Sequence, residues 1–394
     1  MDNNQVKLKR AISSETFIFL FIFLGFFFTL GFIMGGVNMI NTLIGTAYQL
    51  LMDTVFYILA AAVVAGAVSS LLSEFGVIAL INKVLSPLMR PIYGLPGAAS
   101  MGIIATYVSD NPAILPLAND KNFRRYFKKY QLPALTNLGT AFGMGLIVTA
   151  FIIGIPAPSG HSFVLAAVIG NLGAIIGSFV STRLMLRHTS KVYGTAEYCD
   201  PADKDTLEIT NDFRVVRDGN VGLRAINSLL EGGKLGVTLG FDIIPGVLII
   251  CTLVLMLTNG PSSAGIYTGE AFQGVAFFPW VGEKLSFILK LLFGFTSAEA
   301  VAVPITALGA AGAAIGLIPK LVEAGKATGV DIAVFTAMCM CWSGYLSTHV
   351  AMMDSLKARE LTGHAILSHT IGGISAGVAA HLLYKGILLL SSIL

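Results

Sequence analysis

The sequence predicts an all-α polytopic membrane protein, built as an inverted repeat of transmembrane helices with two re-entrant helical hairpins and interfacial amphipathic helices. Composition gives the first reason, because 55% of the 394 residues are hydrophobic and only 12% are charged, far from the average of soluble domains. Several windows of about 20 residues carry no charge, which is enough to cross a hydrocarbon core as a helix. Similar motifs in the two halves of the chain are the third reason.

The first expected helix is the apolar run "TFIFLFIFLGFFFTLGFIMGGVN" at 16–38. It follows Lys7, Lys9 and Arg10, so a secretory signal peptide is the alternative. The run is longer than the apolar core of a signal peptide, and no small-x-small cleavage site follows it. Residues 1–45 are therefore expected to form a cytoplasmic N-terminus and a retained first transmembrane helix.

Further apolar segments continue along the chain. Six more helices are expected, at 52–73, 132–156, 162–185, 236–258, 332–353 and 364–390. Two shorter apolar pieces, 95–118 and 296–319, each follow a moderately amphipathic segment, at 75–94 and 279–294. The polar interval 186–234 holds eight of the 22 acidic residues and is expected to be a cytoplasmic aqueous loop.

The parts of the chain on either side of this loop, 46–185 and 235–394, resemble each other. At an offset of 200 positions, "LSPLMRPIYGLPGAAS" (85–100) aligns with "LSFILKLLFGFTSAEA" (285–300). Further on, "SGHSFVLAAVIG" aligns with "TGHAILSHTIGG". Self-similarity of this kind indicates a structural repeat.

Charge placement gives the two repeats opposite orientations. Basic residues flank 95–118 on both sides, ending with Arg90 before it and starting with Lys121 after it. Because basic residues favour the cytoplasmic side, both ends of this segment are expected there, which makes the segment re-entrant. Tracing the helices onward puts the counterpart, 296–319, on the outside. Inverted repeats with broken helices are typical of secondary transporters, whose substrate site lies near the bilayer midplane.

The stretch "TYVSDNPAILPLAND" carries the main site prediction. Pro112 cannot donate a backbone hydrogen bond and disfavours helix at the residue before it, so a helix is expected to break at Ser109, Asp110 and Asn111. Asp110 or Asn111 would then cap the following segment. Non-helical backbone at membrane depth needs protein or a water-filled cavity around it, so these three residues are expected to line a hydrated substrate site.

The second half presents different chemistry at the corresponding place. The same register gives Gly309-Ala310-Ala311-Gly312, a break without polar side chains, and the acid of this segment is Glu299, with Thr296 and Ser297 beside it. A charge in a membrane segment costs about 3 kcal/mol on insertion scales. Asp110 and Glu299 are therefore expected to bind substrate and to couple transport to H⁺ or Na⁺; a structural ion pair or cap is the alternative.

The expected helix 332–353 contains "CMCWSGYLSTHVAMMD". Spacing of three to four residues can place Trp342, Tyr345 and His349 on one face, next to Ser343, as an aromatic and polar wall for a ligand. His349 is also a candidate for ion coupling. The alternative for all four residues is packing and hydrogen bonding between helices.

Several other polar residues have two readings. Asp53 and Asp242 lie near helix starts, where the helix dipole and interfacial water account for them. His369 could relay protons or pack in the interior. The amide and hydroxyl groups of Thr136, Asn137 and Asn171 could face the cavity or join helices.

Other function classes lack a motif in this chain. There is no GxxxxGK[ST] phosphate loop, and the four cysteines form no CxxC pair and have no histidine at metal-ligand spacing. We therefore expect that the protein is not an enzyme and that it binds no cofactor and no metal ion. The basic aromatic stretch "KNFRRYFKKY" at 121–130 is expected to contact membrane lipids and not nucleic acid.

The motifs "YVSDNPAILPLAND", "GFTSAEAVAVP" and "CWSGYLSTHVAMMDSLKARELTGHAILSHTIGG" resemble those of bacterial membrane proteins with the nucleoside-recognition, or Gate, domain, in particular the YjiH-like branch. The resemblance runs from about residue 50 to 390. It implies a fold similar to that of the concentrative nucleoside transporters, with hairpin residues Asp110, Asn111, Ser297 and Glu299 at the site. Relatives include a dipicolinic acid transporter, spore maturation proteins and the membrane part of a ferrous iron transporter.

The expected function is secondary transport of a small polar organic solute, such as a nucleoside, a nucleobase or a small carboxylate, by alternating access. A noncatalytic membrane scaffold or regulatory subunit, like the spore maturation relatives, is the alternative. The expected location is the bacterial cytoplasmic membrane, as a multi-pass protein. A homo-oligomer is expected, with a second Gate-domain protein as a further possible partner.

Overall fold

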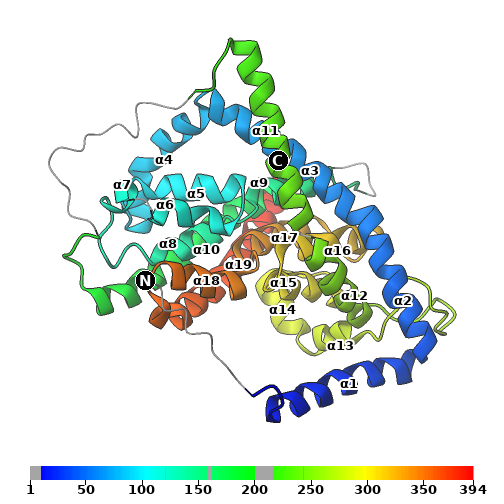
Figure 1. Ribbon diagram of the computed structural model, residues 1–394. Helices are drawn as coiled ribbons and strands as arrows, with labels where there is room; N and C mark the ends of the chain where they lie inside the picture. The colour runs from blue at the N-terminus through cyan, green and yellow to red at the C-terminus, as the bar shows by residue number, and fades with distance from the viewer. Residues whose placement is uncertain (1–9, 120, 158–161, 200–215, 243, 394) are drawn as a thin grey trace.

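The computed structural model describes residues 10–119, 121–157, 162–199, 216–242 and 244–393; this part of the chain consists of helices joined by turns and loops, with one isolated β-bridge and no strand (Figure 1). Five helices within it are long and apolar enough to cross a membrane: Ser14–Met34, Gly36–Glu74, Ala134–Gly154, Val164–Tyr193 and Arg359–Ser391. The sixth candidate is the pair Ser286–Phe293 and Ala298–Ala307, bent by 73°. The predicted all-α membrane class is therefore confirmed.

The elements of the first half, in chain order, are α1 (Ser14–Met34), α2 (Gly36–Gln49), the π-helical η1 (Leu50–Val55), α3 (Phe56–Glu74), α4 (Val77–Tyr93), α5 (Ala99–Val108), the 3₁₀ turn η2 (Asn111–Ala113), α6 (Ile114–Asn119), α7 (Lys121–Arg124), α8 (Ala134–Thr140), α9 (Gly145–Gly154) and α10 (Val164–Tyr193).

Those of the second half are α11 (Val221–Asp242), the π-helical η3 (Gly246–Cys251), α12 (Thr252–Thr258), α13 (Phe277–Lys284), α14 (Ser286–Phe293), the 3₁₀ turn η4 (Ala298–Val301), α15 (Ala302–Ala307), α16 (Ala311–Glu323), α17 (Gly329–Cys341), α18 (Tyr345–Ser355), the 3₁₀ turn η5 (Arg359–Leu361) and α19 (Thr362–Ile393).

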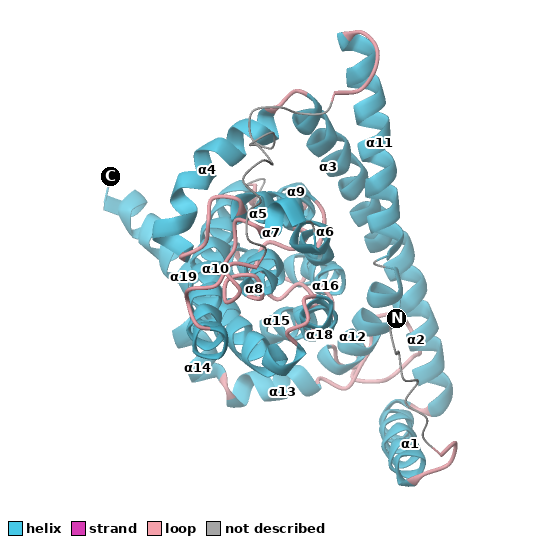
Figure 2. Ribbon diagram, turned by 60° about the vertical axis from the view of Figure 1, so that its left-hand side comes forward, coloured by secondary structure: helices cyan, strands magenta, loops and turns pink. Residues whose placement is uncertain are grey.

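Two long helices, α3 and α11, run side by side along one flank of the molecule, and the short broken helices fill the centre (Figure 2). Glycines allow the two backbones to touch. A Cβ added at Gly66 would overlap the carbonyl oxygen of Gly232, and one added at Gly236 would overlap that of Ala62. Close approach through small residues is how helices gain contact in a lipid environment, where no hydrophobic force pushes them together.

Replacing Gly66 with valine should separate α3 from α11, because the Gly232 carbonyl is backbone and cannot move aside alone. We expect a loss of about 1–3 kcal/mol of stability, as for other overpacked sites, seen as a lower thermal unfolding midpoint in detergent. Gly25→Val in α1 is the matched control, since nothing lies within 4 Å of an added Cβ there. Equal midpoints for the two variants would contradict this account of the crossing.

The second close crossing joins α10 to α19. A Cβ added at Gly173 would lie 2.7 Å from the carbonyl oxygen of Ala376, and one at Gly177 would lie 2.6 Å from that of Gly372. The two glycines of this GxxxG step thus bring the helix backbones into close contact. α17 packs against both helices, so these three elements form the centre of the hydrophobic core.

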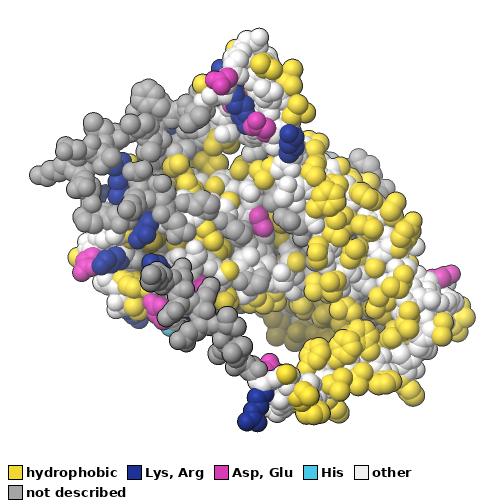
Figure 3. All heavy atoms as spheres, in the orientation of Figure 1, with side chains coloured by type: hydrophobic (Ala, Val, Ile, Leu, Met, Phe, Trp, Pro, Cys, Tyr) yellow, Lys and Arg dark blue, Asp and Glu magenta, His cyan; other side chains and the backbone are white. Residues whose placement is uncertain are grey.

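Helix boundaries near the N-terminus differ from the prediction. The first helix ends at Met34 instead of continuing to 38, because Gly35 adopts a left-handed backbone conformation with φ of 82°. A new helical run starts at Gly36 and continues through η1 to Glu74 as one candidate span. α1 lies at the edge of the molecule, with a band of apolar side chains continuing over it and α2 (Figures 1 and 3).

Two helices predicted as continuous are broken. The span expected at 132–156 ends at Thr140 and resumes at Gly145, and the span at 332–353 ends at Cys341 and resumes at Tyr345. The residue before each restart, Met144 or Gly344, has a left-handed backbone. The prediction missed these breaks because no proline lies at either of them. Glycine weakens the helix there instead: Gly139, Gly143 and Gly145 lie at or beside the first break and Gly344 at the second.

The polar interval 186–234 is not simply a loop. α10 continues to Tyr193, and α11 begins at Val221. The side chain of Asn220 accepts a hydrogen bond from the backbone N–H of Leu223 at 2.9 Å, as an N-cap does. The polar composition of this interval did not indicate the end of α10 or the start of α11. The acidic stretch 200–215 lies outside the described residues.

Candidate functional site

The first helix break lies where Pro112 predicts it. α5 ends at Val108, and the chain turns through Ser109 before η2 begins at Asn111. The carboxylate of Asp110 accepts the backbone N–H of Asn111 at 2.7 Å, and its carbonyl accepts that of Ala113 at 2.9 Å. Of the two residues expected to cap the following segment, Asp110 and Asn111, it is therefore Asp110 that does so.

The second break corresponds to it at an offset of 200. α15 ends at Ala307 and α16 begins at Ala311, with Ala310 in an extended conformation. The backbone N–H groups of Gly309 and Ala310 both donate to the carbonyl of Thr306 at 3.0 Å. The break predicted at 309–312 is thus present, although the structure does not establish that either broken segment is re-entrant.

All four breaks meet at one place, which we call the junction and define by Asn111, Gly143, Ala307, Ser343 and Gly344. The side-chain amide of Asn111 donates to the carbonyl of Ser343. A Cβ added at Gly143 would overlap the Asn111 side chain and lie 2.9 Å from the Cβ of Ser343. The N–H of Gly344 donates to the Ala307 carbonyl at 3.0 Å. Segments more than 200 residues apart in the chain are therefore held together by backbone groups that the breaks expose.

The junction is buried and not fully satisfied. Asn111 has no exposed surface and Ser343 is 4% exposed. The amide nitrogen of Asn111 also lies 3.5 Å from the hydroxyl of Thr348, but its carbonyl oxygen Oδ1 has no hydrogen-bond partner. A buried polar atom without a partner costs about 1–3 kcal/mol, so Oδ1 is a point where an ion, a water molecule or a polar ligand group would be stabilised.

Aromatic and imidazole rings extend from the junction. Trp342 stacks on Tyr345 at 6.2 Å between ring centroids, and Tyr345 meets His349 edge-on at 5.6 Å. Trp342 lies within the break and the other two rings lie on α18, so the three rings do not share one helix face as their spacing predicts; they form a row of contacts that starts in the break. Both ring nitrogens of His349 are buried without a well-formed hydrogen bond, which leaves its donor and acceptor capacity open to a ligand.

His369, in contrast, is held by its neighbours. Its Nε2 contacts the carbonyl of Cys341, which can only accept, so this nitrogen carries the proton. Its Nδ1 then accepts from the hydroxyl of Ser181 at 2.8 Å. Asn137 donates to Ser181 at 3.0 Å and to the Ala365 carbonyl at 2.9 Å. Of the two alternatives for His369, these contacts favour packing in the interior over proton relay. Its ring centroid lies 4.7 Å from that of His349.

The structure does not bring Thr296, Ser297 and Glu299, the predicted hairpin residues of the second half, to the junction. Glu299 lies in η4, at the opposite end of α15 from the break, and forms an ion pair with Lys326 at 2.7 Å. The backbone and hydroxyl of Thr296 donate to Asp331 at 3.0 and 2.7 Å. Ser297 adjoins them, with its buried hydroxyl lacking a well-formed hydrogen bond.

Sequence reasoning missed two buried acids. Asp331 is fully buried and also accepts the N–H of Thr328 at 2.8 Å. The sequence pattern Thr-x-x-Asp at the start of α17, a capping box, could have indicated the role of Asp331. The side chain of Glu74 is 1% exposed and pairs with Arg217 at 2.6 Å and Arg224 at 2.7 Å. Nothing in the local sequence indicates this second pairing. Asp53 is exposed in η1, and the side chain of Asp242 lies outside the described part.

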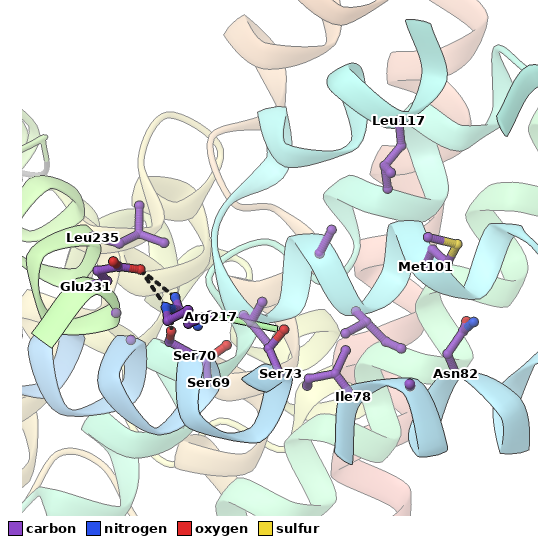
Figure 4. Close-up of a pocket in the computed structure, with 16 residues that line it drawn as sticks. Ser69, Ser70, Ser73, Ile78, Asn82, Met101, Leu117, Arg217, Glu231 and Leu235 are labelled. Atoms are coloured by element: carbon purple, nitrogen blue, oxygen red, sulfur yellow. Dashed lines mark hydrogen bonds and ion pairs between the residues drawn. The ribbon is translucent and has the colours of Figure 1, made fainter. Parts of the chain in front are cut away.

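A cavity of about 550 Å³ opens beside the first break, between α3, α4, α5, α6, the middle of α11 and Arg217 before that helix (Figure 4). Its apolar wall includes Val108, the residue directly before Ser109. Polar groups face it from the other side: Ser69, Ser70, Ser73, Asn82, Arg217 and Glu231. It therefore offers a partly polar route towards the break.

The arginine at this cavity is already neutralised. Arg217 contacts Glu231 at 2.5 Å as well as Glu74, and these carboxylates raise the pKa of its guanidinium, Glu231 most strongly. It therefore stays cationic, but its charge is compensated. Among the described residues, no three His, Cys, Asp or Glu side chains are grouped so that they could hold a metal ion.

Known proteins resemble this chain in sequence over part of its length and in fold over most of it. The family model described as Gate, nucleoside recognition, matches residues 55–179. CNTnw, a concentrative nucleoside transporter, has a similar fold in its inward-facing substrate-bound state, with a TM-score of 0.54 and 16% identity, covering 94% of this chain and 84% of that one. A double variant of CNTnw in an outward-facing state gives a TM-score of 0.54, 14% identity, and coverage of 94% and 85%. No curated protein matches the sequence.

The family match begins at the last residue of η1 and covers α3 to α10 except the end of α10, and so includes the first break and Gly143 of the junction. The structural match extends over both halves. Residues 55–179 thus match the Gate nucleoside-recognition model, and the chain has a fold similar to that of the concentrative nucleoside transporter CNTnw.

Proposed function

We propose that this protein is a secondary transporter of a small polar organic solute, with its substrate site at the junction. The observation that carries the proposal is the convergence of four helix breaks on a buried, incompletely satisfied amide. Broken helices within a membrane are tolerated where their free backbone groups serve a ligand. Nucleosides, nucleobases and small carboxylates are the substrate classes to test.

Correspondences between the halves support alternating access by inverted repeats. Gly94 and Gly294 both end an amphipathic helix with a left-handed backbone, and Met144 and Gly344 both restart a broken helix with one. These pairs are each 200 positions apart. Two repeats of opposite orientation would give the junction one gate on each side of the membrane.

Coupling to H⁺ or Na⁺ is assigned to Asp110, with His349 as a second ionisable group of the same region. Asp110 supplies a carboxylate directly beside the junction amide. Glu299 is retained as a coupling candidate from its position in the membrane segment, although its ion pair with Lys326 gives it a local structural role.

The assignment of Glu299 is tested by two variants. If Glu299 couples transport, Glu299→Gln should remove the ion dependence of uptake into proteoliposomes, while Lys326→Gln should leave it intact. If the ion pair matters only for structure, both variants should lower the thermal midpoint by a similar, small amount, because partly exposed ion pairs contribute about 0–1 kcal/mol. That second pattern, with ion dependence intact, would remove Glu299 from the mechanism.

Ligand-dependent stabilisation of the purified protein tests the function as a whole. A ligand that binds the native state at 100 times its Kd stabilises it by about 2.7 kcal/mol. We expect at least one nucleoside, nucleobase or dicarboxylate to raise the thermal midpoint, and Asn111→Ala to abolish that shift. A flat response of the wild-type protein to the whole panel would favour a membrane scaffold.

A further inference from the structure

The apolar, outward-facing stripe of α10 runs directly into two arginines. Exposed apolar side chains follow one another at helical spacing from Val168 through Leu172 and Ile176 to Phe179. Arg183 continues the same face one turn later, and Arg187 one turn after that. Because α10 has 30 residues and about 20 suffice to cross a hydrocarbon core, its last turns are long enough to reach the headgroup layer.

Both arginines line a groove of about 610 Å³ that lies outside the junction. Its walls come from α10, from the glycine that ends α4, and from the segments around residues 130 and 195. The apolar part consists of Phe179, Val180, Leu184 and Leu186, and the polar part of Tyr130, Arg183, Arg187, Ser190 and Thr195. The groove is thus apolar towards the membrane interior and cationic at its outer end.

Arg183 is fixed in this position. It donates through Nε to the carbonyl of Ile92 at 2.7 Å and through one terminal nitrogen to that of Pro91 at 2.6 Å. These bonds occupy two of its five N–H donors. The carbonyl partners carry no formal charge, so the positive charge of Arg183 is uncompensated by them.

The guanidinium of Arg187 is exposed and forms no hydrogen bond or ion pair within the described part of the chain; only the backbone carbonyl of this residue accepts the hydroxyl of Ser190, at 3.2 Å. The nearby acids are already engaged. Glu197 pairs with Lys129 at 2.5 Å, and Glu360 accepts the hydroxyl of Tyr193 at 2.5 Å. The groove therefore carries a net positive charge next to an apolar surface.

We propose that this groove binds the phosphate of an anionic phospholipid. Arg187 and the free N–H groups of Arg183 contact the phosphate oxygens, and an acyl chain lies along Phe179. Basic pockets between transmembrane helices bind anionic headgroups in this manner, because charge and apolar surface are satisfied by one molecule.

The site has a structural consequence for the transporter. Arg183 joins α10 to the end of α4, and α4 leads through Gly94 into the first broken segment. A bound lipid would add a second link at the same place, so the anchoring of the first half would depend on lipid composition.

The test uses delipidated, full-length protein in detergent and compares phosphatidylglycerol, phosphatidylcholine and inorganic phosphate. Phosphatidylglycerol should raise the thermal midpoint saturably, and native mass spectrometry should detect the bound lipid. Arg187→Gln should weaken this binding about fivefold, since a basic residue near the surface contributes on the order of 1 kcal/mol to it.

Lys191→Gln is the matched control, because it removes the same charge from the same helix end without lining the groove; its lipid binding should equal that of the wild type. Equal weakening in both variants would show diffuse electrostatic attraction and overturn the site. So would equal stabilisation by phosphatidylcholine. Saturable stabilisation by inorganic phosphate alone, as strong as by lipid, would identify a free-anion site instead.

Discussion

Asp110→Asn is expected to abolish ion-coupled uptake while leaving the protein folded in the membrane. The carboxylate at position 110 accepts the N–H of Asn111, and an amide oxygen can still do so. The cap therefore survives, but the group can no longer carry a charge, release a proton or hold a cation strongly. A charge-assisted interaction contributes about 1.5–3 kcal/mol, so uptake should fall more than tenfold.

The measurement is substrate uptake into proteoliposomes with and without an imposed proton or sodium gradient. Wild-type protein should respond to one of the two gradients, and the variant to neither. Glu323→Gln is the control, because Glu323 is an exposed acid of α16 that pairs with Lys320 one turn away; its uptake should be normal. Full gradient-driven uptake by Asp110→Asn would remove Asp110 from the coupling mechanism.

Gly143→Ala is expected to block transport through steric effects alone. Its backbone conformation accepts alanine, since Gly143 is not among the left-handed residues. The new methyl group would overlap Asn111 Oδ1, and the Cβ of Ser343 lies 2.9 Å away, so the Asn111 side chain must leave its position. Uptake should fall more than tenfold, with about 1–3 kcal/mol of stability lost.

A second substitution distinguishes a local clash with Asn111 from a general loss of folding. Asn111→Ala and Gly143→Ala alter the same contact, so their effects on stability should be strongly non-additive in a double-mutant cycle. Gly309→Ala at the second break is the control, because the nearest atom to its added Cβ is 3.7 Å away; it should transport normally. Additive effects of the first pair would mean that the junction contact does not operate as described.

Helix class and the first break could be predicted from local chemistry. Apolar segments of sufficient length require helices in a membrane because every backbone polar group must be paired internally. Pro112 removes one such pair wherever it lies, so the break beside Asp110 follows from that residue alone. The breaks at Met144 and Gly344 were missed, since glycine permits a break but does not impose one.

Partners distant in the chain could not be predicted. Glu74 is held by Arg217, 143 positions away, and Glu299 by Lys326 across a folded segment. An isolated acid in an apolar stretch gives the same sequence pattern whether it binds a coupling ion or pairs with a basic side chain elsewhere in the chain. The sequence therefore could not distinguish the role of Glu299 from that of Asp110.

The amino-acid sequence by itself determined that this chain is a helical membrane protein with a repeated pattern and a proline-induced break, because each follows from hydrophobicity and backbone chemistry over a few turns. Only the tertiary structure decided that Asn111, Gly143, Ser343 and Gly344 share one place. The reason is physical: which exposed backbone groups meet depends on how helices pack, and the glycine contacts that set this packing join segments far apart in the chain.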